Sequence, residues 1–280
     1  MRKLVIGASR ALSAQPLGTL GEEHVFFDSH GLGKQANPVL HASHIRGTTA
    51  AAGCFVRPES GIECLTLVLH GALDVQDSAG HHAHLQAGDA EWSTAGHGTL
   101  HRYAGATDTP VEALSVWLNL PAAYKSTPPH SQPLRAADIP AVPLPDDAGS
   151  ARIIAGEWQG QIGPAETATP VQCWDVHLRA GHTLDAPLPR GWYASALIVA
   201  GEAAVDFWPG SLAAPSLVFF DAAGDQVQIH ALADTRLLLL SAAPLEEPLA
   251  TADAIVSNSP AELEQALEAI RTGLWGSLPA

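Results

Sequence analysis

The sequence predicts an all-β protein made of two tandem antiparallel β-barrels, followed by a short C-terminal helix. Two observations carry this prediction. Short apolar runs are separated by Gly, Pro, Asp and Asn, and the same rhythm returns in the second half of the chain. Turn signals recur at intervals of about 8–12 residues, which is typical of sandwiches and barrels. An internal duplication is the economical explanation of such a repeat.

The first half contains a clear series of strands and turns. Residues 64–69 form an apolar run that predicts a strand, Gly71 predicts a turn, and residues 72–76 alternate like a half-buried strand. A further turn at Gly88-Asp89 leads into residues 90–92. We therefore expect hairpin to follow hairpin through this region.

The second half repeats this order. Its predicted strands are residues 195–199, 203–207, 217–220 and 227–230, with a turn at Gly201. At the start of the chain, the basic pair Arg2-Lys3 precedes the apolar residues 4–6. Arg10 follows before a longer apolar core can form, which favours a first strand over a signal peptide.

One helix is predicted near the C-terminus. Ser259 is a suitable N-cap, Pro260 suits the first turn, and Glu262 completes a capping box. Gly273 is expected to end the helix. The predicted organisation is a first barrel domain at residues 1–130 that carries the pocket, a linker rich in Pro and Asp at 131–150, and a second barrel domain with the helix at 151–280.

Composition restricts the classes of function. Apolar residues make up 46% of the 280 residues and charged residues 15%, which is typical of a globular protein, and the formal net charge is −15. Such an acidic chain without a Lys/Arg cluster disfavours binding to nucleic acid or to anionic membranes. The three cysteines form no CxxC pair, which fits a reducing compartment, so we expect a cytoplasmic protein.

Several short motifs, in their order and spacing, resemble the pirin family of bicupins. In the first half these motifs are residues 61–63, 67–71, 77–80 and 94–96, followed by Gly98 and His101. In the second half they are residues 152–157, 163–165, 169–170 and 180–181, followed by the capped helix. The resemblance covers nearly the whole chain and implies two tandem cupin domains. Pirins typically bind iron or another divalent metal in the N-terminal cupin, and some have quercetin 2,3-dioxygenase activity.

The family's metal motif, His-x-His on one strand and His-x-Glu on another, is changed here. Arg57 and Glu59 occupy the first pair of positions, and His101 and Tyr103 the second. Arg57 has no lone pair to offer, and Tyr103 would have to ionise before it could coordinate a metal. Only Glu59 and His101 remain as candidate metal ligands, and the same two are the candidate catalytic residues. A non-heme iron site needs roughly two imidazoles and a carboxylate.

Two interpretations of this site remain open. In the preferred one, Arg57 replaces the metal and pairs with Glu59 or Glu63. In the other, Glu59 and His101 form a rebuilt metal centre with a neighbouring histidine such as His97. The predicted ligand pocket accordingly comprises six residues: Arg57, Glu59, Glu63, His97, His101 and Tyr103.

These interpretations lead to three hypotheses for function. The preferred one is a protein without a metal cofactor that binds a small anionic or phenolic ligand in the first barrel. The alternative is an iron-type, metal-dependent dioxygenase similar to quercetin 2,3-dioxygenase. A third hypothesis is a regulatory interaction protein whose protein partner the sequence does not identify.

The remaining histidines and the second barrel also allow predictions. His81, His82 and His84 are expected on a polar surface hairpin, whereas His41 and His44 are expected in a loop that could face the pocket. In the second barrel, the offsets that place Arg57 and Glu59 before Gly71 place Pro187 and Pro189 before Gly201. Proline side chains cannot coordinate a metal, so the second barrel is expected to be metal-free.

Overall fold

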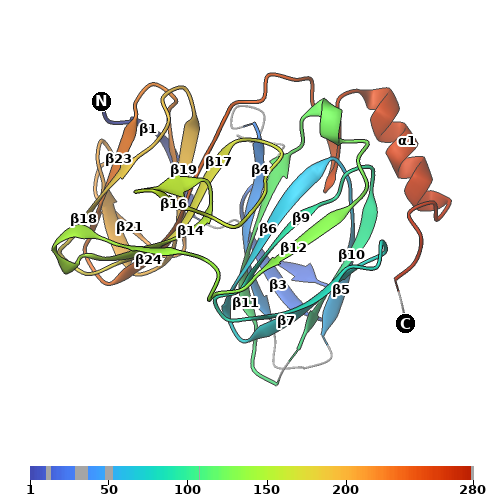
Figure 1. Ribbon diagram of the computed structural model, residues 1–280, viewed down its shortest axis with the longest axis horizontal. Coiled ribbons are helices and arrows are strands. Elements are labelled where there is room, and N and C mark those ends of the chain that lie inside the picture. Colours follow the sequence, from blue (N-terminus) through green and yellow to red (C-terminus); the bar gives the residue numbers. More distant parts are fainter. Residues whose placement is uncertain (11–13, 29–36, 48–52, 107, 279–280) are drawn as a thin grey trace. The chain divides into compact units, whose positions relative to one another are not determined.

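The computed structural model describes residues 1–10, 14–28, 37–47, 53–106 and 108–278, and it is built almost entirely of β-strands (Figure 1). It divides into two compact units, each of which contains a seven-stranded and a four-stranded sheet. The first barrel unit comprises Leu12–Ala136 and Leu245–Ala280, and the second barrel unit comprises Met1–Ala11 and Ala137–Pro244. The predicted all-β class with two tandem barrels and one short helix is confirmed.

The first barrel unit contains eleven strands in its two main sheets, two short strands, a 3-10 turn and the single α-helix of the described residues. Its elements are β2 (Ala14–Leu17), β3 (Gly21–Phe27), β4 (Val39–Gly47), β5 (Cys54–Glu59), β6 (Ile62–His70), β7 (Ala72–Asp77), β8 (His82–Gln86), β9 (Ala90–Thr94), β10 (Thr99–Gly105), β11 (Glu112–Asn119), η2 (Ala122–Tyr124), β12 (His130–Leu134), β25 (Ala250–Ala252), β26 (Ile255–Ser257) and α1 (Pro260–Arg271). The large sheet has the order β12-β9-β6-β11-β4-β3-β2, and the small one β5-β10-β7-β8.

The second barrel unit repeats this plan. Its elements are β1 (Val5–Arg10), β13 (Ala141–Pro143), η3 (Pro145–Asp147), β14 (Gly149–Ala155), β15 (Glu157–Trp158), β16 (Gln161–Ile162), β17 (Val171–Leu178), β18 (Thr183–Pro187), β19 (Tyr193–Ala200), β20 (Glu202–Val205), β21 (Ser211–Ala213), β22 (Ser216–Phe220), β23 (Gln226–Ala231) and β24 (Thr235–Ala242). The large sheet has the order β1-β22-β19-β24-β17-β14-β13, and the small one β18-β23-β20-β21.

Corresponding turns in the two units show why the predicted glycines are needed. Gly71 joins β6 to β7 with a φ of +72°, and Gly201 joins β19 to β20 with a φ of +83°. A Cβ at Gly71 would lie 2.7 Å from the Pro110 carbonyl oxygen, and one at Gly201 would lie 2.2 Å from the Asp234 carbonyl oxygen. Only glycine combines the left-handed conformation with such a close approach of the backbone.

The compact units group the chain differently from the expected domain boundaries. The expected linker at 131–150 contributes a strand to each unit, because β12 pairs with β9 and β13 pairs with β14. Both are edge strands, which have no neighbouring strand on one side, so the missing N–H groups of Pro133 and Pro143 cost no interstrand hydrogen bond on that side. The terminal helix and β26 belong to the first unit and not to the second, whereas β1 pairs with β22 in the second.

The helix α1 has the predicted start. The Ser259 hydroxyl accepts a hydrogen bond from the Glu262 backbone amide, and the Glu262 carboxylate accepts one from the Ser259 amide. The apolar stripe of α1 is only partly covered, since none of its residues is fully buried. No helix within the described residues is long and apolar enough to cross a membrane.

Candidate functional site

Strand pairing brings the matched motif positions together inside the first barrel unit. In the antiparallel pair β5–β10, Arg57 lies opposite His101 and Glu59 lies opposite Thr99. Side chains alternate along a strand, so Arg57 and Glu59 project to the same interior side as His101 and Tyr103. All four side chains are buried. The predicted motif positions therefore form one cluster.

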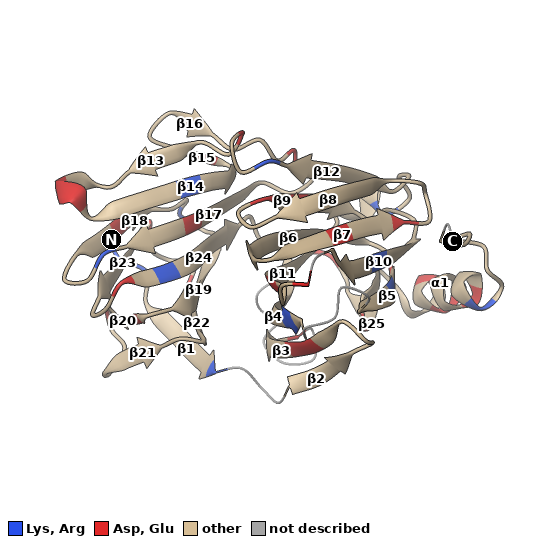
Figure 2. Cartoon of the chain, turned by 90° about the horizontal axis from the view of Figure 1, so that it is seen from below, with Lys and Arg blue, Asp and Glu red and all other residues tan. Residues whose placement is uncertain are grey.

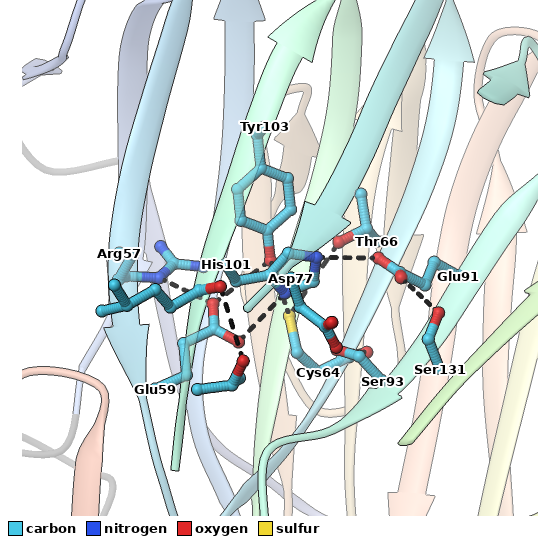
Figure 3. Close-up of polar contacts among 12 residues, drawn as sticks. Arg57, Glu59, Cys64, Thr66, Asp77, Glu91, Ser93, His101, Tyr103 and Ser131 are labelled. Atoms are coloured by element: carbon cyan, nitrogen blue, oxygen red, sulfur yellow. Dashed lines mark hydrogen bonds and ion pairs between the residues drawn. The ribbon is translucent and has the colours of Figure 1, made fainter. Parts of the chain in front are cut away.

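Glu59 is at the centre of this cluster (Figure 3). Its Oε1 accepts hydrogen bonds from Arg57 Nε at 3.1 Å and from the Tyr103 hydroxyl at 3.2 Å, and its Oε2 lies 3.3 Å from His101 Nδ1. Burial alone would raise the pKa of Glu59, but the positive charges of His101 and Arg57 lower it to about 2. Glu59 is therefore a carboxylate under all ordinary conditions.

His101 lies between two carboxylates. Its Nδ1 faces Glu59, and its Nε2 lies 3.4 Å from Oε2 of Glu91, whose other oxygen accepts a hydrogen bond from Ser131. Burial would lower the pKa of His101, but Glu91 and Glu59 outweigh that effect and raise it to about 10. His101 is thus an imidazolium at neutral pH, with both ring nitrogens protonated and no lone pair available.

Arg57 is enclosed by aromatic rings and acidic groups. Its Cζ lies 4.4 Å from the centroid of the Trp117 ring and 5.4 Å from that of Phe55. Its Nε donates to Glu59, whereas its buried Nη2 has no hydrogen-bond partner among the described residues. Arg57 also lines a cavity of about 630 Å³ between β2 and β5, whose lining includes Leu17, Glu23 and Phe55.

Neither the phenol nor the thiol of the cluster ionises readily. Burial raises the pKa of Tyr103 well above 10, with the nearby Cys64 and Glu59 adding to the effect. Burial likewise raises the pKa of Cys64 to about 12. The Cys64 sulfur lies 3.6 Å from the Ser115 hydroxyl and 4.0 Å from that of Tyr103. These groups act as neutral hydrogen-bonding partners at physiological pH.

A second group of buried polar residues lies on the neighbouring strands β3 and β4. Glu23 Oε1 lies 3.1 Å from His41 Nε2 and accepts a hydrogen bond from the Ser43 hydroxyl at 2.5 Å. Burial would raise the pKa of Glu23, but His41 and Arg57 lower it to about 2. The His41 ring stacks on Trp117 with centroids 3.9 Å apart. His41 is therefore linked to the Arg57 cluster through both Glu23 and Trp117.

Sequence reasoning did not find several of these residues. Glu23, Glu91 and Trp117 were not predicted, and the expectation that His41 and His44 lie in a loop is wrong, since both are buried residues of strand β4. The alternation of His41, Ser43 and Ile45 within an apolar run is the signal that could have placed His41 on a buried strand face.

Two of the predicted pocket residues have other surroundings. Glu63, on β6, is buried and accepts a hydrogen bond from the Trp92 indole at 3.1 Å. His97 is exposed in the turn after β9, where it lines a separate cavity of about 630 Å³ beside α1, together with Lys125 and Trp275. His97 is thus outside the Arg57 cluster. The surface position predicted for His82 and His84 is confirmed.

The donor atoms at the motif positions do not fit a divalent metal ion. Arg57 offers only N–H donors, and the buried Tyr103 phenol resists ionisation, which leaves Glu59 and His101 as the two conventional ligands, fewer than a non-heme iron site uses. Among the described residues, no group of three or more His, Cys, Asp and Glu side chains is arranged to hold a metal ion. The interior of the second unit is lined by apolar side chains, with Pro187 at the end of β18.

Two tandem barrels of one plan in a single chain define a bicupin. The family description "Pirin" matches residues 11–118, and "Pirin C-terminal cupin domain" matches residues 173–276. The chain belongs to the pirin family, as its motifs predicted. A Pseudomonas aeruginosa protein provisionally named a quercetin 2,3-dioxygenase is 36% identical over 224 residues, which are 77% of this chain and 77% of that protein.

Two solved structures extend the comparison. A crystal structure of quercetin 2,3-dioxygenase from Acinetobacter baumannii has a TM-score of 0.93 and 27% sequence identity, and the match covers 99% of each chain. A bacterial pirin from Escherichia coli in complex with nickel(II) has a TM-score of 0.68 and 16% identity, covering 85% of this chain and 99% of that one. The second of these similarities concerns the fold alone.

Proposed function

We propose that the first barrel unit binds a small phenolic or anionic molecule through Arg57, at a site that has exchanged the family's metal for a guanidinium. The observation that carries this proposal is the buried Arg57 Nη2, which lacks a hydrogen-bond partner among the described residues. A buried N–H group without a partner costs about 1–3 kcal/mol, so a ligand oxygen at this position would recover much of that free energy.

The cavity beside Arg57 has the size and lining that a small ring needs. Its volume of about 630 Å³ lies in the range of ordinary ligand sites. Leu17 and Phe55 supply apolar wall, while Arg57 and Glu23 supply one donor and one acceptor. A ligand with an aromatic body and one polar group satisfies both kinds of surface.

The charge balance favours a phenol over a permanently charged anion. Glu59 and Glu23 both have a pKa lowered to about 2, so two negative charges already face the Arg57 guanidinium. A carboxylate ligand would meet these charges, whereas a phenolic hydroxyl can accept from Arg57 and donate to Glu23. We therefore expect phenols to bind more tightly than carboxylates on the same ring.

Isothermal titration with phenol and benzoate tests this proposal. We expect phenol to bind more tightly, and Arg57→Met to weaken its binding about tenfold or more, because the donor is lost while the side-chain volume is kept. Arg102→Met is the matched control, since Arg102 lies on β10 with its side chain on the outer face. Unchanged affinity in Arg57→Met, or no binding of either probe to the parent protein, contradicts the proposal.

Elemental analysis of untagged protein separates this function from the dioxygenase alternative. We expect no stoichiometric metal, because the motif positions supply only one carboxylate and one imidazole. Near-stoichiometric iron or nickel that is lost in both Glu59→Ala and His101→Ala would instead support a metal-dependent dioxygenase similar to quercetin 2,3-dioxygenase. Oxygen consumption with a flavonol would then be the deciding measurement.

A further inference from the structure

The outer face of the large sheet in the second barrel unit carries a row of polar side chains. Register places Ser150 of β14 opposite His177 of β17, and His177 opposite Arg236 of β24. The alternate residues Val176 and Leu237 belong to the apolar core, so the polar row lies on the opposite face of the sheet. Three adjacent strands thus present polar groups side by side.

A buried carboxylate holds two arginines on this face. Asp175, whose side chain is 1% exposed, accepts hydrogen bonds from Arg236 Nε and Nη2, both at 2.9 Å, and from Arg152 Nη1 at 3.2 Å. Figure 2 shows the acidic position on β17 between basic positions on β14 and β24. The bidentate contact fixes the plane of the Arg236 guanidinium.

These side chains line a hollow of about 830 Å³ in the same unit. Arg152, Arg236 and Arg179 lie in its wall, whereas Asp234 is the one carboxylate of the lining within the described residues. The chain has only 14 Lys and Arg against 29 Asp and Glu, so three arginines at one hollow are an unusual gathering of guanidinium groups. Arg152 and Arg236 share Asp175, and Arg179 pairs with Asp147, so a bound anion would add to or compete with these contacts. The small neighbours Gly149, Ser150 and Ala200 leave the space open.

We propose that this hollow binds the phosphate group of a small phosphate monoester, or inorganic phosphate itself. Arg152 and Arg236 come from the separate strands β14 and β24, and Arg179 directly follows β17, so three guanidinium groups reach the hollow from different elements. A tetrahedral anion with several oxygens matches donors that converge from different sides better than a flat carboxylate does. A nucleic acid would need a broad basic surface, which this acidic chain lacks.

His177 provides a readout at the same site. Burial lowers its pKa, and Arg236 and Arg152 lower it further, while Asp175 acts in the opposite direction. A bound phosphate would add negative charge beside the ring and stabilise the imidazolium. We expect the pKa of His177, followed by NMR and assigned with His177→Gln, to rise by about half a unit or more at saturating phosphate.

The direct test is isothermal titration of the full chain with inorganic phosphate, glycerol phosphate and acetate. We expect both phosphates to bind with a Kd of about 1 mM or tighter and acetate to bind at least about tenfold more weakly. Arg236→Gln should lower phosphate affinity about tenfold. Arg179→Gln, which leaves the Asp175 contacts intact, should lower it about threefold.

Arg190→Gln is the matched control, because Arg190 is an exposed arginine of the same unit outside the hollow. It should leave phosphate affinity unchanged. Three results would overturn the proposal: no phosphate binding to the parent protein together with an unshifted His177, equal affinity for acetate, or an equal loss of affinity in Arg190→Gln. Because the site lies in the second unit, these results are independent of any ligand at Arg57.

Discussion

The two barrel units have the same sheet plan but differently filled interiors. In the second unit, the interior cluster is apolar and includes the stacked pair Trp158 and Trp174, with ring centroids 4.5 Å apart. In the first unit, an apolar cluster around Leu73 and Leu85 shares the interior with the charged cluster of Arg57, Glu59 and His101. One fold thus tolerates both interiors, provided that buried charges are paired.

The difference between the two interiors bears on the proposed binding site of the first unit. Buried ion pairs rarely stabilise a protein more than apolar side chains of similar volume would. An interior that could be apolar, as the second unit demonstrates, but retains an Arg–Glu–His cluster beside a cavity is more readily explained by recognition than by stability. This contrast supports the proposal that the first unit binds a ligand, because the shared fold alone does not account for its charged interior.

The largest expected change in stability comes from a substitution in the apolar interior of the second unit. Trp174→Ala should destabilise that unit by about 4 kcal/mol, because a large cavity would open in its apolar core cluster. Trp174→Phe should cost much less, since the indole N–H has no partner among the described residues to lose. Hydrogen exchange resolved by unit would measure both, and equal costs for the two variants would contradict this expectation.

Removal of one buried charge should destabilise the first unit almost as much as Trp174→Ala destabilises the second. Glu59→Gln leaves the Arg57 and His101 cations without their shared carboxylate and should cost about 3 kcal/mol. The same variant should lower the pKa of His101. Urea unfolding followed by circular dichroism gives the stability, with the exposed Glu264→Gln on α1 as a control expected to change it by less than about 0.5 kcal/mol.

The charged interior should also make the first unit dependent on pH. The pKa of His101 is raised to about 10 from an ordinary value of 6.5. Its stabilising contribution is therefore complete below about pH 6.5 and is lost as pH rises towards 10. Melting temperatures across this range should fall in the parent protein and fall less in His101→Gln. Parallel curves for the two proteins would exclude His101 as the cause.

The smallest expected change in stability comes from a substitution that makes the interior of the first unit slightly less polar, as the second one is. Tyr103→Phe removes a hydroxyl that donates to Glu59 and keeps the ring stacked on Phe55 with centroids 4.7 Å apart. We expect a loss of about 1 kcal/mol, because Glu59 retains its contacts with Arg57 and His101. Thermal unfolding beside Tyr124→Phe, an exposed tyrosine of the same unit, would detect the difference.

Local pattern was sufficient to predict much of the fold. The strands around residues 64–69 and 217–220 were predicted because apolar runs end at turn-forming residues, and the capped helix because Ser259, Pro260 and Glu262 have defined positions in a helix start. The edge strands β12 and β13 were not predicted, because their prolines are typical of a linker when the neighbouring strand is unknown.

The candidate site was predictable only in part. Arg57, Glu59, His101 and Tyr103 lie on two strands that pair directly, so a motif could identify them together. Glu91 and Glu23 reach the cluster from β9 and β3 of the other sheet, and no local spacing encodes which strands face each other across a barrel. His97 is close to His101 in the chain, but its turn directs it to the cavity beside α1.

The exchange of terminal segments between the units has a consequence for biosynthesis. A nascent chain that has left the ribosome up to residue 136 carries every strand of the two main sheets of the first unit, but lacks β25, β26 and α1. The backbone of Ser60, next to the Arg57 cluster, bonds to residues 254 and 256 of that late segment. The first unit therefore cannot complete its fold at this end of the barrel until the whole second unit has been synthesised. A truncated chain would leave this end of the barrel accessible to chaperones and proteases.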